Sequence, residues 1–150
     1  IISPVISLGE LEVYDIKNDA ISSINDKWTL VFFVESECNQ SCEDKLYQVR
    51  QIRLALGKDR DQVDRLLVSR KIQSWEAFSD SFNGQKYIDP KSKDYERLVK
   101  KFEEYPKFDI SGTYLIDPFG FLMMKYKFDA NPMGTIKDIE RLIKNQKWLV

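Results

Sequence analysis

Hydrophobic residues in the first third of the chain form two contrasting patterns. The continuous apolar run WTLVFFV, at Trp28–Val34, is rich in β-branched and aromatic residues, which is typical of a strand buried on both faces. The segment ECNQSCEDKLYQVRQIRLALG then places apolar residues at helical spacing, and Gly57 indicates where this helix ends. We expect Ser41 to be the N-cap of the helix, with Asp44 as a capping-box partner.

The rest of the chain continues to alternate between strand-like and helix-like patterns. LGELEVYDI, at Leu8–Ile16, predicts an edge element of a sheet. In chain order, the later predicted elements are a strand at Gln62–Ser69, helices at Ser74–Phe82 and Ser92–Tyr105, a hairpin at Gly112–Phe128 and an amphipathic helix at Asn131–Gln146. A βαβ half followed by a ββα half predicts a thioredoxin-like α/β fold, with a central mixed sheet flanked by helices and with a C-terminal β-hairpin and helix.

Length and composition are those of an ordinary soluble globular protein. The 150 residues suit one domain, which we assign to 1–150, and the apolar and charged fractions of 43% and 31% are average. The 23 basic and 24 acidic residues nearly cancel, so nothing indicates the clustered basic surface that binds nucleic acid. No run of 18 apolar residues occurs, so we expect no membrane span within this chain.

The chain contains no histidine, and this narrows its chemistry. Nucleophilic sites that pair serine or cysteine with histidine are excluded, as are histidine-based zinc sites. The two cysteines are too few for a disulfide scaffold, but they suffice for one bridge or one soft-metal site.

Cys38 and Cys42 stand between the predicted buried strand and the helix that follows it. A helix N-terminus presents unpaired backbone N–H groups, which stabilise a thiolate. We therefore predict a redox-active pair, in which Cys38 in the loop is the attacking thiol and Cys42 in the first turn is the resolving thiol. Acidic neighbours oppose thiolate formation, so we do not expect an extremely acidic thiol. These neighbours are Glu35, Glu37, Glu43 and Asp44.

Other interpretations of the cysteine pair stay open at this point. The thiols could bind a soft metal such as Cu(I), form a structural disulfide, or have no relation to each other. A structural disulfide would close only a small loop, and stabilisation through chain entropy grows with loop length. We therefore favour the redox and metal interpretations.

Two segments of the chain resemble the Sco/SenC family, thioredoxin-fold proteins that help to assemble the copper centre of cytochrome c oxidase. KWTLVFFVESECNQSCEDKL is similar to the family's strand followed by C-P-x-x-C-P, an acidic residue and Leu, with Cys38, Cys42 and Leu46 at matching positions. GTYLIDPFGFLMMKY resembles the family's hairpin. The resemblance extends from about Trp28 to the C-terminus.

The chain also departs from the family pattern. Asn39 and Glu43 replace the two motif prolines, and Asp109 falls where the family has the histidine of its Cys-Cys-His copper site. Carboxylate is a poor ligand for Cu(I), so Met123, Met124 and Met133 are the candidate third ligands, and of these Met133 is expected in an exposed loop. Asp109 is also a candidate proton acceptor, because the fold is expected to bring the loop YPKFDISG near Cys38.

The resemblance implies a thiol–disulfide oxidoreductase or redox chaperone that acts on a protein partner, with an oxidase copper-site subunit as one candidate. The alternatives are a Cu(I) metallochaperone that uses Cys38 and Cys42, and a non-catalytic assembly protein with a vestigial site. Thiol exchange requires no cofactor, and whether the chain is an enzyme is left open.

The resemblance further implies a periplasmic or other extracytoplasmic location, with a membrane anchor. The chain begins at Ile1 without Met, which suits the removal of an N-terminal signal or anchor that ended near IISPVI. An ordinary N-terminal strand is the alternative interpretation of this segment.

Overall fold

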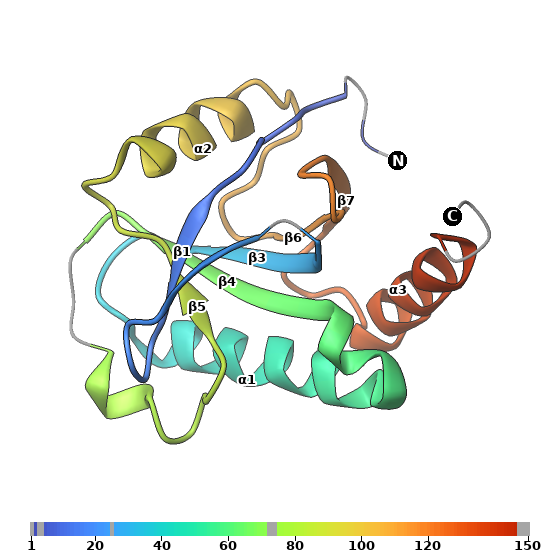
Figure 1. Ribbon diagram of the computed structural model, residues 1–150, viewed down its shortest axis with the longest axis horizontal. Coiled ribbons are helices and arrows are strands. Elements are labelled where there is room, and N and C mark those ends of the chain that lie inside the picture. Colours follow the sequence, from blue (N-terminus) through green and yellow to red (C-terminus); the bar gives the residue numbers. More distant parts are fainter. Residues whose placement is uncertain (1, 3–4, 25, 72–74, 147–150) are drawn as a thin grey trace.

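A computed structural model of the chain describes residues 2, 5–24, 26–71 and 75–146. Among these residues, seven strands form one mixed sheet in the order β2-β1-β5-β4-β3-β6-β7 (Figure 1). The strands are β1 (Glu12–Asp15), β2 (Ile21–Ser23), β3 (Trp28–Val34), β4 (Val63–Ser69), β5 (Lys86–Tyr87), β6 (Thr113–Ile116) and β7 (Leu122–Tyr126). The helices are α1 (Gln40–Ala55), α2 (Lys93–Glu103) and α3 (Pro132–Gln146), with two 3-10 helices, η1 (Gly57–Gln62) and η2 (Glu76–Phe78).

The apolar run that predicts a buried strand is β3, near the middle of the sheet. It pairs in parallel with β4 and antiparallel with β6. Leu30 and Phe32 pack into the core on the α1 side of the sheet, whereas Val31 and Phe33 pack into the core on the α2 side. Because both faces are buried, the sequence of this strand shows no polar alternation.

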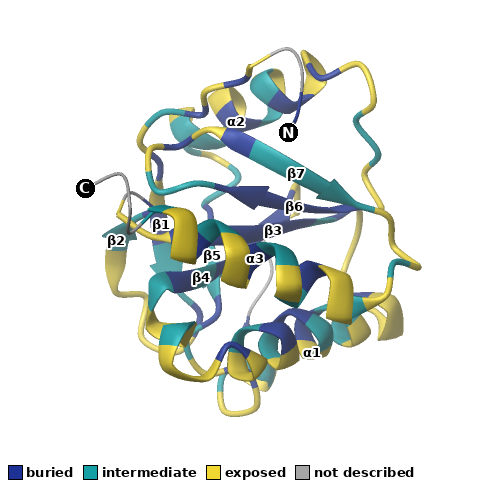
Figure 2. Cartoon of the chain, turned by 90° about the vertical axis from the view of Figure 1, so that its right-hand side faces the viewer, coloured by how far each residue is buried: buried dark blue, intermediate teal, exposed yellow. Residues whose placement is uncertain are grey.

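Helices cover both faces of the sheet, as the sequence predicts. Figure 1 shows α1 and α3 on one side of the sheet and α2 on the other. On α1 the inward residues Cys42, Leu46, Val49 and Ile52 are buried. Figure 2 shows the same division, with buried inward faces and exposed outward faces on α1 and α3. The mixed sheet, the hairpin β6–β7 and the closing helix α3 confirm the predicted thioredoxin-like arrangement.

Some predictions about single elements are wrong. The strand in LGELEVYDI is not an edge, because β1 lies between β2 and β5. The predicted helix at Ser74–Phe82 is limited to η2 and turns, and Ser74 lies outside the described residues. Trp75 and Phe82 are buried in the core on the α1 side, so their packing outweighs the local helical pattern.

The N-terminal segment is part of the fold. The backbone N–H of Leu8 donates to the Gly120 carbonyl at 2.8 Å, and that of Leu122 donates to the Ile6 carbonyl at 2.9 Å. Ile6 and Leu8 are buried, so this end of IISPVI packs against the hairpin. Ile1, Ser3 and Pro4 lie outside the described residues. No helix in the described ranges combines the length and the apolar character needed to cross a bilayer.

Candidate functional site

Cys38 and Cys42 form a disulfide at the start of α1. Their Cα atoms are 5.1 Å apart, within the usual range for disulfides. Cys38 lies in the loop that leaves β3 and is half-buried, whereas Cys42 lies in the first turn of α1 with 5% exposure. Cys38 is therefore the more exposed residue of the pair, as expected.

The N-cap of α1 is Asn39, not Ser41 as the sequence analysis predicts. The Cys42 backbone N–H donates to Asn39 Oδ1 at 3.1 Å, which satisfies one of the unpaired donors of the first turn. Ser41 lies inside the helix, because α1 begins at Gln40. Asn39 thus has a local structural role at a position where the resembled family has proline.

The acidic residues around the disulfide lie mostly in solvent. Glu35, Glu37 and Asp44 are exposed, and Asp44 accepts a hydrogen bond from Gln40 Nε2 at 2.8 Å. Glu43 lies in the first turn of α1, where the helix dipole favours a negative charge. Because water and salt screen exposed charges, these acids oppose a thiolate less than their number suggests.

A cavity of about 500 Å³, which we call the cysteine cavity, adjoins the disulfide. The end of β3, the first half of α1 and two loops remote in sequence form its walls. Wall residues include Cys42, Lys45 and Gln48 from α1, Ile110 and Ser111 from the loop before β6, and Phe128 after β7. Of the two cysteines, the buried Cys42 is the one in the wall of this cavity.

Lys45 is the one positively charged side chain among the described residues that line the cysteine cavity. It follows Cys42 by three residues, so both side chains lie on one face of α1. Its Nζ donates to Gln48 Oε1 at 3.2 Å, and burial lowers the pKa of the Lys45 ammonium group. An ammonium group here is suited to stabilise a thiolate released at Cys42.

The loop YPKFDISG reaches the cysteine cavity as expected, but through Ile110 and Ser111 rather than through Asp109. Ser111 donates to Asp109 Oδ1 from its hydroxyl at 2.7 Å and from its backbone N–H at 3.0 Å. These hydrogen bonds lower the pKa of the Asp109 carboxyl. Its carboxylate is therefore held in a turn and is a poor proton acceptor at neutral pH.

Among the described residues, no methionine lines the cysteine cavity, and Met123 and Met124 pack against the core on the α1 side of the sheet. Met133 is 55% exposed, as expected, but it lies at the start of α3 instead of in a loop, and it does not line the cysteine cavity. Within the described ranges, no group of three or more cysteine, histidine or acidic side chains could hold a metal ion. The three-ligand copper site of the resembled family does not fit the residues present.

The sequence analysis missed Phe128 as a wall residue of the site, and within the loop YPKFDISG it singled out Asp109 instead of Ile110. Phe128 gave no signal, because an aromatic residue at the end of a hairpin is equally typical of a packed strand.

Comparison with known proteins identifies the family. Residues 28–145 match the family described as the transmembrane-like, thioredoxin-like, C-terminal domain. The chain belongs to this family. The match includes the disulfide, the strands β3 and β4, the hairpin and most of α3. Comparison with curated proteins finds no match.

Solved structures of Sco proteins are similar to this thioredoxin-like domain. Copper-bound ScoI of Bradyrhizobium japonicum is 21% identical, with a TM-score of 0.64 over 91% of this chain and 98% of that protein. A SCO1/SenC family lipoprotein of Bacillus anthracis is 17% identical, with a TM-score of 0.71 over 95% and 99%. BsSco, a Sco-family cytochrome c oxidase assembly protein with a disulfide switch, is 15% identical, with a TM-score of 0.67 over 94% and 96%. The structures agree with the resemblance found in the sequence, and at these identities they establish a shared fold.

Proposed function

We propose that this thioredoxin-like domain exchanges thiols and disulfides with a protein partner through Cys38 and Cys42. The observation that supports this most directly is a disulfide at a helix N-terminus in which Cys38 is half-buried and Cys42 is buried. Such unequal access allows an external thiolate to reach one sulfur while the other is the leaving group. The disulfide switch of BsSco, which has the same fold, supports the same chemistry.

The proposed exchange starts from the oxidised domain, in which Cys38 and Cys42 form the disulfide. A partner thiolate attacks Cys38 Sγ, so a bond forms between the partner sulfur and Cys38 while the bond between Cys38 and Cys42 breaks. Cys42 leaves as a thiolate beside the N-terminus of α1 and near Lys45. A second partner thiolate then attacks the partner sulfur of the mixed disulfide, releasing an oxidised partner and a reduced domain. The reverse sequence reduces a partner disulfide, so two electrons are exchanged in either direction.

Single cysteine variants test this proposal. Reduced Cys42→Ser should form a stable mixed disulfide with glutathione through Cys38, because no resolving thiol is left. Reduced Cys38→Ser should react at least about tenfold more slowly with oxidised glutathione, because the remaining cysteine, Cys42, is buried. Mass spectrometry of the adducts measures both rates. Equal rates in the two variants would contradict the assigned order, and no adduct in either variant would contradict exchange itself.

An extracytoplasmic location and an oxidase copper-site subunit as partner are part of the proposal. The lipoprotein of Bacillus anthracis and the oxidase assembly protein BsSco support them by analogy of fold. Crosslinking through the Cys42→Ser variant in the native host, followed by mass spectrometry of the captured partner, tests both assignments.

A Cu(I) carrier is the second candidate function, because ScoI of Bradyrhizobium japonicum binds copper with the same fold. In this chain the reduced pair Cys38 and Cys42 would be the ligands. Anaerobic titration of the reduced domain with Cu(I) against a strong chelator distinguishes the candidates. Retained copper at stoichiometric chelator would favour a carrier, whereas complete loss of copper would leave thiol exchange alone.

A further inference from the structure

A second cavity lies between α2 and the sheet, because its wall includes residues of α2, β3 and β4. Figure 1 shows α2 on the side of the sheet opposite α1. The volume of this cavity is about 400 Å³, within the range of ligand sites. Apolar side chains form most of its wall, so we call it the apolar cavity. The wall includes Phe33, Val68, Tyr95, Val99, Phe108 and Ile110.

The apolar cavity adjoins the cysteine cavity. Phe33, Val34, Glu35 and Ile110 line both cavities, so one wall separates the disulfide site from the apolar cavity. Ile110 is 40% exposed on this wall. A polypeptide chain that crosses Ile110 would therefore contact both cavities.

Aromatic residues in the wall of the apolar cavity pack against one another. The ring of Phe33 packs edge-on against the rings of Phe102 and Phe108, with centroids 4.9 and 5.2 Å apart. Phe102 is fully buried, whereas Phe33, Tyr95 and Phe108 are half-buried. The core thus fixes aromatic surface that is partly open to solvent, which suits an apolar ligand.

Charged residues contribute little to the character of this cavity. Glu35 and Glu103 on its wall are opposed in part by Arg70, and the other wall residues carry no charge. A cation or an anion would find no concentrated charge of opposite sign. An uncharged apolar group gains from burial alone.

We propose that the apolar cavity binds an aromatic or branched aliphatic side chain of the polypeptide whose cysteine exchanges with Cys38. The inference rests on the proposed exchange and adds the sequence preference of the partner. Cys42 of the pair lines the cysteine cavity, and this cavity shares a wall with the apolar cavity, so an extended peptide bound at the pair can place a neighbouring side chain in the apolar cavity. The apolar cavity then holds the partner while its sulfur attacks Cys38.

Two peptides test this preference. Each has one cysteine in a Gly/Ser heptapeptide, with Phe in one and Ser in the other at the second residue on each side of the cysteine. The peptide thiolate attacks Cys38 Sγ of the oxidised domain, and alkylation traps the released Cys42 thiolate. We expect the Phe peptide to react about tenfold faster than the Ser peptide at low concentration, because apolar burial favours its binding. Equal rates would overturn the inference.

Substitutions in α2 test whether the faster reaction of the Phe peptide depends on the apolar cavity. Val99→Trp fills the apolar cavity and Val99→Glu places a charge in it, so both should reduce the rate ratio of the two peptides to about one. Lys100→Trp is the matched control, because Lys100 is an exposed neighbour on the same helix, and it should keep the ratio. A ratio that survives both Val99 variants, in protein with unchanged circular dichroism, would overturn the inference. Reaction with dithiothreitol distinguishes failure of this inference from failure of the proposed exchange. If dithiothreitol does not reduce the disulfide of the wild-type protein, the proposed exchange is contradicted.

Discussion

Asn39 shows how one side chain shapes the environment of the disulfide. It lies between the two cysteines in sequence, and its Oδ1 accepts the hydrogen bond from the Cys42 backbone N–H. The same oxygen therefore stabilises the start of α1 and fixes the backbone of the buried cysteine. A proline at this position could form no such cap, since it has no side-chain acceptor.

Loss of this cap should destabilise the protein. We expect Asn39→Ala to lower the free energy of unfolding by about 1 kcal/mol, because the N–H of Cys42 loses its acceptor. Asn39→Ser keeps a side-chain oxygen and should remain close to wild type. Chemical denaturation of the oxidised protein measures both changes, and equal stability of the two variants would show that the cap contributes nothing.

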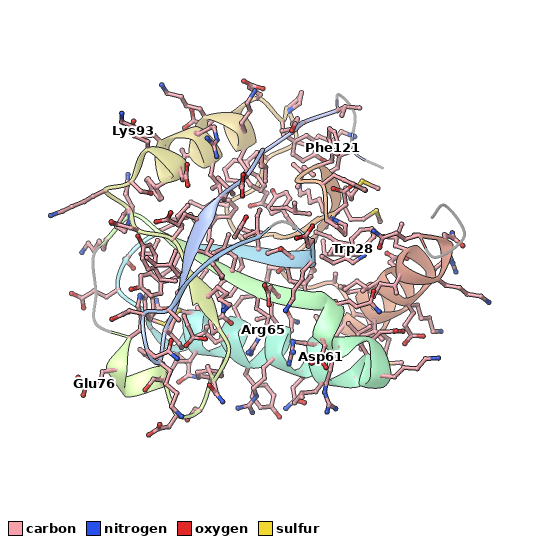
Figure 3. All side chains as sticks on the ribbon, viewed as in Figure 1. Trp28, Asp61, Arg65, Glu76, Lys93 and Phe121 are labelled. Carbon is pink, nitrogen blue, oxygen red and sulfur yellow. A yellow bond between two sulfur atoms is a disulfide. The ribbon has the colours of Figure 1, made fainter. Side chains whose placement is uncertain are left out.

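Arg65 is a buried cation between β4 and α1 (Figure 3). Its Nη2 donates to the carbonyl of Asn83 at 2.7 Å, whereas Nε and Nη1 have no hydrogen-bond partner among the described residues. Burial, and then repulsion by Arg53 and Arg50, lowers the pKa of this guanidinium to about 10. Because the folded protein binds this proton more weakly than the unfolded chain does, the charge opposes folding at neutral pH.

Replacement of Arg65 by an apolar residue of similar length should stabilise the protein. We expect Arg65→Met to raise the free energy of unfolding by about 1–3 kcal/mol at pH 7, since it removes an unpaired buried charge. The carbonyl of exposed Asn83 can bond to water instead. Urea denaturation at pH 7 measures the change. A loss of stability would show that the contact with Asn83 outweighs the desolvation of the charge.

At the scale of elements, the hairpin β6–β7 depends on contact with the N-terminal segment. Gly120 in its turn has φ of +91°, and a Cβ atom there would come within 2.9 Å of the Gly9 carbonyl oxygen. The Gly120 carbonyl also accepts the Leu8 N–H. Glycine is thus required both by the backbone conformation and by the close approach of another segment.

Substitutions of Gly120 and Gly134 should change the free energy of unfolding in opposite directions. Gly120→Ala should lower the free energy of unfolding by about 1–3 kcal/mol through strain and the contact with Gly9. Gly134→Ala, in α3 with open space around its added Cβ, should raise it by about 0.5–1 kcal/mol. Thermal denaturation of both variants compares them, and equal effects would contradict the role assigned to the turn.

Elements that depend on short-range patterns were predictable, whereas elements that depend on remote packing were not. β3 follows its continuous apolar run, because both of its faces are buried, and α1 follows its apolar spacing, because its burial repeats with the period of a helix. Ser74–Phe82 contains apolar residues at helical spacing, yet Trp75 and Phe82 are drawn into the core as part of an irregular segment. Local propensity is a weak guide wherever large aromatic residues can be buried elsewhere.

For the molecule as a whole, the sequence predicts the position of the cysteine pair but not the cavities around it. A cysteine pair between a buried strand and a helix is a local pattern. The cysteine cavity also needs Ile110 and Phe128, which the fold of the sheet brings to Cys42 from remote positions. The apolar cavity likewise depends on the distance between α2 and the sheet, which no sequence spacing encodes.

The equilibrium reduction potential of the pair tests the central claim that Cys38 and Cys42 exchange disulfides with a partner. The domain is equilibrated in glutathione or dithiothreitol buffers of graded potential, and the free thiols are counted after acid quenching. We expect a value between about −120 and −270 mV, the range of proteins that exchange disulfides as their function. A value below about −300 mV would mark a structural disulfide and contradict the proposed exchange, as would the failure of the pair to form a disulfide at all.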